Sequence, residues 1–323
     1  MNYLLQIEKR GKVGYKLSIY RKTVVMVVIV SLLGFVTLSP TLNAAEIIPV
    51  KQLQEVEKLL YGEVKQKSLL KRIDDLEKTL YGKEQSGTIV ERAHTITKDV
   101  LKNNDGPTLV FIVNTLEWTL ANDLEQGNIV KRLKDLESII FGSPRTGAVI
   151  DRVNKLVKMG LPSGEVPFET VALTADSLIK IRLLNKISSM SSQAGEIINF
   201  EVAEDVKVNN KLIIPEGTRG NMKVTEINKA GQMGQDGEVK LDFAPIRAID
   251  GTTIALSIRK KAQEENRSQQ LAIGASFLGS IILGPVGLIT GYFVKGNEKE
   301  IPAGSKMYIQ TSSKKMIYGL KLN

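Results

Sequence analysis

A ten-residue phrase recurs in the first half of this chain at multiples of 20 residues, and no other feature restricts the fold as strongly. It reads "LQEVEKLLYG" from Leu53, "IDDLEKTLYG" from Ile73, "NTLEWTLAND" from Asn114 in the same frame, and "LKDLESIIFG" from Leu133. A second phrase shares the period: "GTIVERA" from Gly87, "GNIVKRL" from Gly127 and "GAVIDRV" from Gly147. Units this short cannot bury an apolar face alone, so they must pack against one another.

Each unit predicts one helix and one turn. Ile73, Leu76 and Leu80 are three and four residues apart, so they share a helical face. Gly82 follows the last apolar residues, where a helix often ends in a left-handed residue that glycine tolerates. Residues 46–160 therefore predict about six helices in an antiparallel repeat bundle or a short helical stack. Short polar residues near the following helix starts are expected to act as caps: Ser86, Asn128 and Thr146.

The repeated polar and aromatic residues allow two interpretations. The turn aromatics are Tyr61, Tyr81 and Phe141. They form either a row that binds sugar or peptide, or part of the core at the helix ends, which we favour. The charged series is Glu57, Glu77 and Glu137 with Arg72, Arg92, Arg132 and Arg152. It either recognises charged ligands or, as we favour, forms ion pairs between units or solvated faces.

Residues 1–45 have the layout of a signal peptide. Six basic residues and one acidic residue in the first 22 precede the uncharged, mostly apolar segment 23–39, and Pro40 and "TLNAAE" follow it. An uncleaved N-terminal anchor is the alternative, because the segment is just long enough to span a bilayer. Both interpretations place the rest of the chain outside the cytoplasm. We expect the periplasm or outer membrane of a diderm bacterium or, alternatively, an outward-facing protein anchored in the inner membrane.

Composition excludes several kinds of site. The chain has no cysteine and one histidine, His94, which we expect on a helix surface without a carboxylate partner at ligand spacing. The net charge is +9, and the first 22 residues carry five of those charges, so the remainder is only weakly basic and predicts no nucleic-acid partner. The aspartates of the second half show no spacing that pairs an acid with a base: Asp205, Asp236, Asp242 and Asp250. We expect no catalytic site, cofactor or metal.

The helical half resembles the repeated units, of the form RL-x-x-LE followed by an aromatic and a glycine, of predicted exported proteins in several diderm lineages. The resemblance covers about residues 50–158. It implies a helical envelope module and no known chemistry.

The second half predicts a β-rich domain (171–323) after a Pro/Gly linker (161–170). Short alternating segments separated by turn residues favour a small barrel or sandwich. The expected strands are 196–202, 211–214, 221–227, 238–243, 253–258 and 306–311. "IPEGT" (Ile214–Thr218) and "IPAGS" (Ile301–Ser305) predict tight turns between strands. The whole chain is therefore expected to be an α+β multidomain protein.

An uncharged, glycine-rich segment interrupts the β-rich half at residues 271–294. Its 24 residues are long enough to span a bilayer as one helix, although Pro285 favours a kink or a hairpin of two half-helices. One interpretation is contact with membrane lipid or self-association, and the other is an apolar hairpin packed on the barrel. The residues expected to make the contact are Gly274, Gly279, Gly284, Pro285, Gly287 and Gly291.

The β-rich half is loosely similar to the outer-membrane channel barrel of type IV secretion systems. The likeness rests on Asp205-Val206, Ile214–Thr218 and Asp250-Gly251, over about residues 193–311. It implies a barrel with an apolar helical insert that crosses the outer membrane.

These features predict a non-enzymatic envelope protein. The helical repeats would serve as a spacer or as a surface for an envelope or cell-wall partner, and the C-terminal module would contact a membrane or a second copy. The alternative is a subunit of an envelope channel or secretion scaffold. An enzyme acting on the cell wall is disfavoured, because no catalytic set can be assembled from the sequence.

Overall fold

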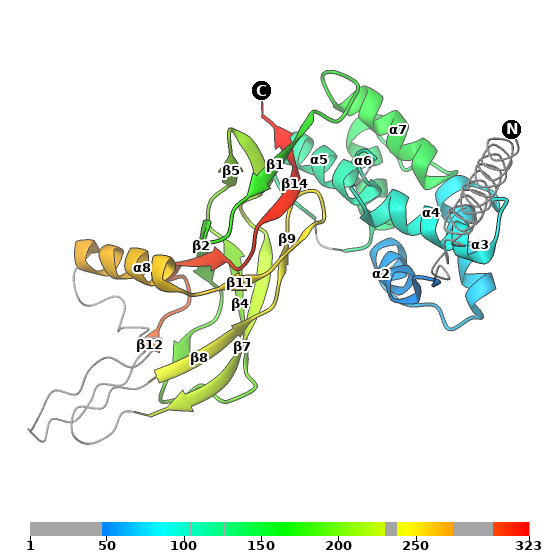
Figure 1. Ribbon diagram of the computed structural model, residues 1–323. Coiled ribbons are helices and arrows are strands. Elements are labelled where there is room, and N and C mark those ends of the chain that lie inside the picture. The colour runs from blue at the N-terminus through cyan, green and yellow to red at the C-terminus, as the bar shows by residue number, and fades with distance from the viewer. Residues whose placement is uncertain (1–46, 104, 126, 230–237, 274–299, 323) are drawn as a thin grey trace, which may run out of the picture. The chain divides into compact units, whose positions relative to one another are not determined.

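The computed structural model describes residues 47–322, apart from 104, 126, 230–237 and 274–299 (Figure 1). The predicted signal peptide or anchor lies outside the described residues. Ile48–Asn323 form one compact unit, which contains a helical part followed by a β-rich part. The α+β class is confirmed, and the predicted division into domains stays a prediction.

Six helices follow one another in the first part, and from the second onward each begins 20 residues after the one before it. The period of the sequence is thus the period of the helices. They are α2 (Val50–Tyr61), α3 (Leu69–Tyr81), α4 (Ile89–Leu101), α5 (Leu109–Ala121), α6 (Ile129–Phe141) and α7 (Val149–Gly160).

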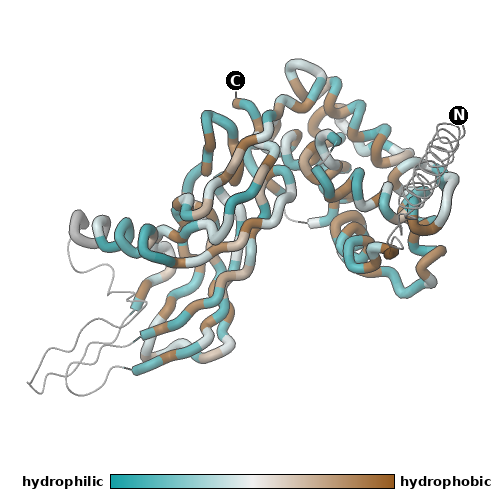
Figure 2. Tube along the Cα trace, in the orientation of Figure 1, coloured by the Kyte–Doolittle hydropathy of each residue, from teal (hydrophilic) through white to brown (hydrophobic). Residues whose placement is uncertain are grey.

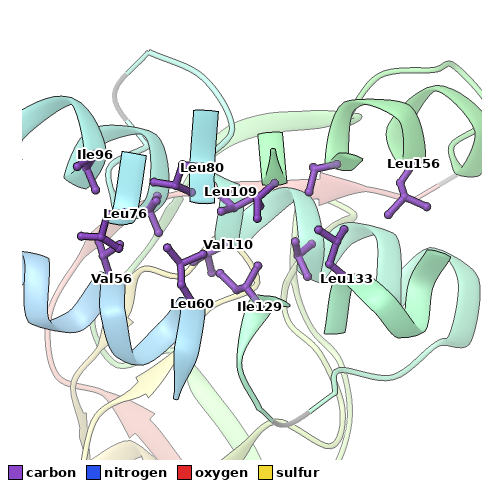
Figure 3. Packing of buried hydrophobic residues seen from close by; sticks show 14 of the residues in the cluster. Val56, Leu60, Leu76, Leu80, Ile96, Leu109, Val110, Ile129, Leu133 and Leu156 are labelled. Carbon is purple, nitrogen blue, oxygen red and sulfur yellow. The ribbon is translucent and has the colours of Figure 1, made fainter. Parts of the chain in front are cut away.

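The apolar stripe of every helix enters one shared core. Figure 3 shows side chains from all six helices meeting there, among them Leu60, Leu80, Ile96 and Leu133, all fully buried. The helices also contact partners that are distant in the sequence, since α2 touches α6 and α3 touches α7. The six helices therefore close into one cluster, whereas in an open stack each unit would touch only its neighbours.

Helix ends follow the expected chemistry at most positions. Gly62, Gly82 and Gly142 end their helices with φ of 87°, 76° and 75°, and each donates its backbone N–H to the carbonyl four residues earlier. Asn128 caps α6 as predicted, accepting from the backbone N–H of Lys131. Ser86 and Thr146 do not cap: α4 is capped by Thr88, which forms a capping box with Glu91, and α7 begins after Ala148.

The β-rich part contains two main sheets, and every strand pairing in them is antiparallel. One has the strand order β11-β13-β2-β4-β7-β8 and the other β1-β14-β6-β5. The six-stranded sheet consists of β11 (Leu256–Ser257), β13 (Lys306–Thr311), β2 (Leu178–Leu183), β4 (Ile197–Val202), β7 (Arg219–Asn228) and β8 (Glu238–Phe243). The four-stranded sheet consists of β1 (Phe168–Leu173), β14 (Lys315–Lys321), β6 (Lys211–Ile214) and β5 (Val206–Val208). Two short pairs complete the part: β9 (Ile246–Arg247) with β10 (Thr253–Ile254), and β3 (Ile187–Ser188) with β12 (Glu300–Ile301).

The six-stranded sheet curls until its edge strands β8 and β11 touch, which makes a nearly closed barrel. Alternation of side chains explains the inner face. In β2 the buried residues Ile179, Ile181 and Leu183 alternate with Lys180 and Arg182, and the inward side chains of both sheets share one core. The expected small barrel is therefore the better of the two predicted architectures.

Several predicted strands have the bounds that the structure shows, namely 211–214, 238–243 and 306–311. Both IPxG segments form turns, and Gly217 and Gly304 adopt left-handed φ of 81° and 86°. The strand expected at 253–258 is divided into β10 and β11. Sequence reasoning missed β1, β2 and β14, and β1 begins inside the predicted linker 161–170.

One further helix, α8 (Lys260–Ile273), lies against β13 and is largely hydrophilic along its described length (Figure 2). Asn266 on α8 donates to the carbonyl of Tyr308 at 2.8 Å and accepts its N–H at 2.6 Å. The helix thus covers part of the β13 edge beyond the short strand β11.

Candidate functional site

The predicted membrane contacts cannot be placed, because all six lie outside the described residues: Gly274, Gly279, Gly284, Pro285, Gly287 and Gly291. Two described elements connect to that segment. α8 leads into it and β12 follows it, and β12 pairs with β3 of the β-rich part. No helix in the described ranges has the length and apolar character needed to cross a bilayer.

The repeated glutamates and arginines form buried ion pairs between consecutive helices. Each glutamate pairs with the arginine 15 residues later, at nearest N–O distances of 2.5 to 2.7 Å. The four pairs found in the described helices are Glu57–Arg72, Glu77–Arg92, Glu117–Arg132 and Glu137–Arg152. The prediction of ion pairs between units is confirmed, and the alternative of a solvated face is wrong, since these side chains are almost fully buried.

Three of these carboxylates also fix the turn that follows their helix. Glu77, Glu117 and Glu137 each accept the backbone N–H of the residue eight positions later. At Glu137, burial raises the pKa, but hydrogen bonds from Arg152 and the Arg145 backbone lower it further, so the pKa lies below its ordinary value of 4.5. At Glu117 burial prevails and the pKa is raised.

One link of the series is absent from the sequence on both sides. Where the period would place a glutamate the chain has Thr97, and where it would place the arginine it has Ile112. The link between α4 and α5 therefore has neither charge, and no buried charge is left unpaired there.

Helix α5 follows that break and also packs against the β-rich part. Phe111 is fully buried with Leu212, Ile249 and Leu320, and its ring meets that of Phe168 edge-on at 6.1 Å. This helix is apolar on more than one face, because it contributes to the core of the helices and to this second cluster.

Polar contacts reinforce the same junction. Asn114 of α5 donates to the Ile249 carbonyl at 2.7 Å and accepts from Arg132 at 2.6 Å. Asp250 is buried and accepts from the Asn103 side chain at 3.0 Å and from the Tyr318 backbone at 2.9 Å. Burial raises the pKa of Asp250, and its hydrogen bonds oppose that rise. Asp250 is thus a structural anchor in a predicted turn, and the sequence gave no sign of this role.

The other candidate acids and the histidine show no shared site. Asp205 accepts a backbone N–H from Glu216, Asp242 is exposed on β8, and Asp236 lies outside the described residues. His94 is half-buried on α4, contrary to the expected surface position. Among the described side chains, no group of three His, Asp or Glu residues is placed to hold a metal.

The three turn aromatics are half-buried against the helical core. The Tyr61 hydroxyl lies 2.8 Å from the Thr79 hydroxyl, and the Tyr81 hydroxyl donates to Asp99 at 2.8 Å. Burial, followed by the hydrogen bond to Asp99, raises the pKa of Tyr81. Phe141 has no hydroxyl, so the polar contact of the other two aromatics is not available to it.

A pocket of about 330 Å³ opens beside Phe141, between the end of α6 and the middle of α7. The residues that line this Phe141 pocket are Glu137, Phe141, Arg145, Thr146, Arg152, Lys155 and Met159. The Arg145 guanidinium lies over the Phe141 ring, 5.0 Å from its centroid. Sequence reasoning singled out Phe141, Glu137 and Arg152 but missed Arg145, Lys155 and Met159, because these three do not repeat.

No protein-family model matches this chain, and a comparison with curated proteins finds no match. Among solved structures, one match is ComB10 of the Com type IV secretion system of Helicobacter pylori, at 16% sequence identity and a TM-score of 0.27. The match covers 45% of this chain and 90% of that one. Superposition at that level carries no conclusion about function, so the role of this chain rests on its own residues.

Proposed function

We propose that the protein is an exported, non-enzymatic scaffold of the cell envelope. Its body would hold the apolar segment 271–294 against membrane lipid or a second copy. The observation that carries the proposal is that the ends of this uncharged segment join α8 and β12, and both elements belong to the compact unit that also contains the helices.

The fate of the recurring polar groups supports a structural role. The repeated glutamates and arginines are occupied by ion pairs between helices, and Asp250 is occupied by the junction with the β-rich part. Groups that are bonded in this way stabilise the fold and are not free to transfer protons.

A subunit of an envelope channel or secretion scaffold is the second candidate. The nearly closed barrel with an apolar insert beside it favours this candidate, since such inserts could line up in a ring of copies. Large symmetric oligomers of the full chain in mild detergent, seen by light scattering and electron microscopy, would distinguish it from a scaffold that acts alone.

Membrane fractionation tests the main proposal. A chain in which a Gly/Ser linker of equal length replaces 271–294 is compared with the unaltered chain, because the linker keeps α8 and β12 connected. Both are exported behind a leader that is known to be cleaved in place of residues 1–45, so that an uncleaved anchor cannot hold them. We expect carbonate-resistant association with the membrane, or detergent-stable oligomers, only for the unaltered chain.

Equal behaviour of the two chains would refute the proposal. Circular dichroism of both chains checks that the linker has not unfolded the body. Turnover of a cell-wall substrate by the purified chain would instead support an enzyme.

A further inference from the structure

The turn aromatics offer an internal comparison, because the period places the same two positions of the next helix beside each of them. These positions lie 14 and 18 residues after the aromatic. For Tyr61 they are Asp75 and Thr79, and the tyrosine hydroxyl contacts the Asp75 carbonyl and the Thr79 hydroxyl. For Tyr81 the second position is Asp99, whose carboxylate accepts the tyrosine hydroxyl. The first two units thus fill this place with their own polar groups.

The unit of Phe141 has a different chemistry at the same place. The two positions are Lys155 and Met159, and both line the Phe141 pocket. Met159 is 66% exposed. An apolar ring and an exposed thioether therefore stand where the other units have a hydroxyl and an oxygen acceptor.

The charges of the pocket are unbalanced. Arg152 is neutralised by Glu137, with both of its hydrogen bonds at 2.7 to 2.8 Å. Arg145 and Lys155 have no ion-pair partner in the described part of the chain. The mouth of the pocket consequently carries two free cations beside an aromatic ring.

We infer that the Phe141 pocket binds an acidic peptide segment of a partner protein, with a side-chain carboxylate between Arg145 and Lys155 and a neighbouring apolar side chain against Phe141 and Met159. The unit of Tyr81 shows that this place accommodates a carboxylate, because Asp99 occupies it there. Here the carboxylate would come from another molecule, and arginine and lysine are suited to pair with it.

This inference deepens the proposed function by naming the chemistry of the partner. The two fail separately, since membrane fractionation depends on residues 271–294 and not on the pocket. A scaffold without this peptide site and a peptide-binding protein without membrane contact would each be recognised.

Fluorescence anisotropy tests the inference with the purified full chain in non-ionic detergent. The probe is a labelled hexapeptide of alternating Asp and Leu, and the matched probe has Asn in place of Asp. We expect the acidic probe to bind at least about tenfold more tightly than its amide counterpart. Lys155→Glu should abolish that difference, whereas Lys134→Glu, on the exposed surface of α6 outside the pocket, should retain it.

A second variant separates lost binding from lost folding. Phe141→Tyr combined with Met159→Asp copies the pair Tyr81–Asp99 and supplies an internal carboxylate. We expect it to fold, as checked by circular dichroism, and to bind the acidic probe at least about tenfold more weakly than the unaltered chain. Equal loss in Lys155→Glu and Lys134→Glu, or full binding by the double variant, would overturn the inference. So would displacement of the probe by inorganic phosphate but not by succinate at equal ionic strength.

Discussion

Each buried ion pair of the repeat joins two helices and leaves no charge without a partner. Arg72 donates to both oxygens of Glu57, at 2.8 and 2.7 Å, and both side chains are almost completely buried. Such pairs add little net stability compared with apolar residues of similar size, but the loss of one partner is costly. The simultaneous change to Thr97 and Ile112 in one link is consistent with that asymmetry.

Replacing one partner of a pair should therefore cost more than replacing both. Arg72→Ile leaves Glu57 buried and unpaired, and we expect it to lower the free energy of unfolding by about 3–5 kcal/mol. The double variant Glu57→Thr/Arg72→Ile copies the natural link of Thr97 and Ile112 and should lose clearly less. Urea denaturation followed by circular dichroism measures both values. A double variant as unstable as the single one would contradict this account.

Glu137 should make stability depend on pH. Its pKa is lowered in the folded state, so the folded chain binds a proton there more weakly than the unfolded chain does. The stabilisation is present above the ordinary value of 4.5 and is lost as the pH falls through the folded-state pKa.

The difference in unfolding free energy between the unaltered chain and Glu137→Gln should therefore be larger at about pH 7 than at about pH 3. Urea denaturation at the two pH values measures it. A gap that widens on acidification would show that the sign is wrong.

Among the elements, α5 differs most from its neighbours, and the difference follows from its two packing partners. It lacks the arginine of the series, and it carries Phe111 and Asn114, which contact the β-rich part. The repeat is thus interrupted at the helix that serves as the junction. An arginine at position 112 would need a carboxylate at position 97, and the chain has neither.

Phe111→Ala should weaken the junction more than the helical core. Removal of a buried phenylalanine costs about 3–5 kcal/mol, because it leaves a cavity. Trp118, the one tryptophan of the chain, packs against the same cluster and reports on it. In urea we expect its fluorescence transition to precede the loss of helical circular dichroism in Phe111→Ala, whereas the two should coincide in the unaltered chain.

Ile96→Ala is the matched control, because Ile96 is fully buried in the helical core on α4. It should move both transitions together. If Phe111→Ala also moves both together, the junction is not a separate point of weakness.

Taken together, the described residues form a body that combines a closed helical cluster with a nearly closed barrel through one helix. The barrel edge is covered where α8 lies on β13, and Asn266 there supplies an amide that pairs with the strand backbone. The apolar segment and the Phe141 pocket belong to different parts of this body. A scaffold of this kind could contact a membrane and a protein partner independently.

Much of this architecture could be predicted from local patterns. The spacing of apolar residues, Gly82 at a helix end and the alternation of residues 238–243 each act within a few neighbouring positions, so the sequence alone determined these helices and strands. The pairing of the repeated charges could also be foreseen, because their period matched that of the helices.

Only the tertiary structure decided which contacts join distant segments. The burial of Asp250 under Asn103, the closure of the barrel and the meeting of Arg145 with Lys155 beside Phe141 depend on positions that do not repeat. Periodicity identifies the face that a residue occupies but not the face that lies opposite. That choice follows from packing the entire chain into one compact unit, in which every buried polar group must find a partner.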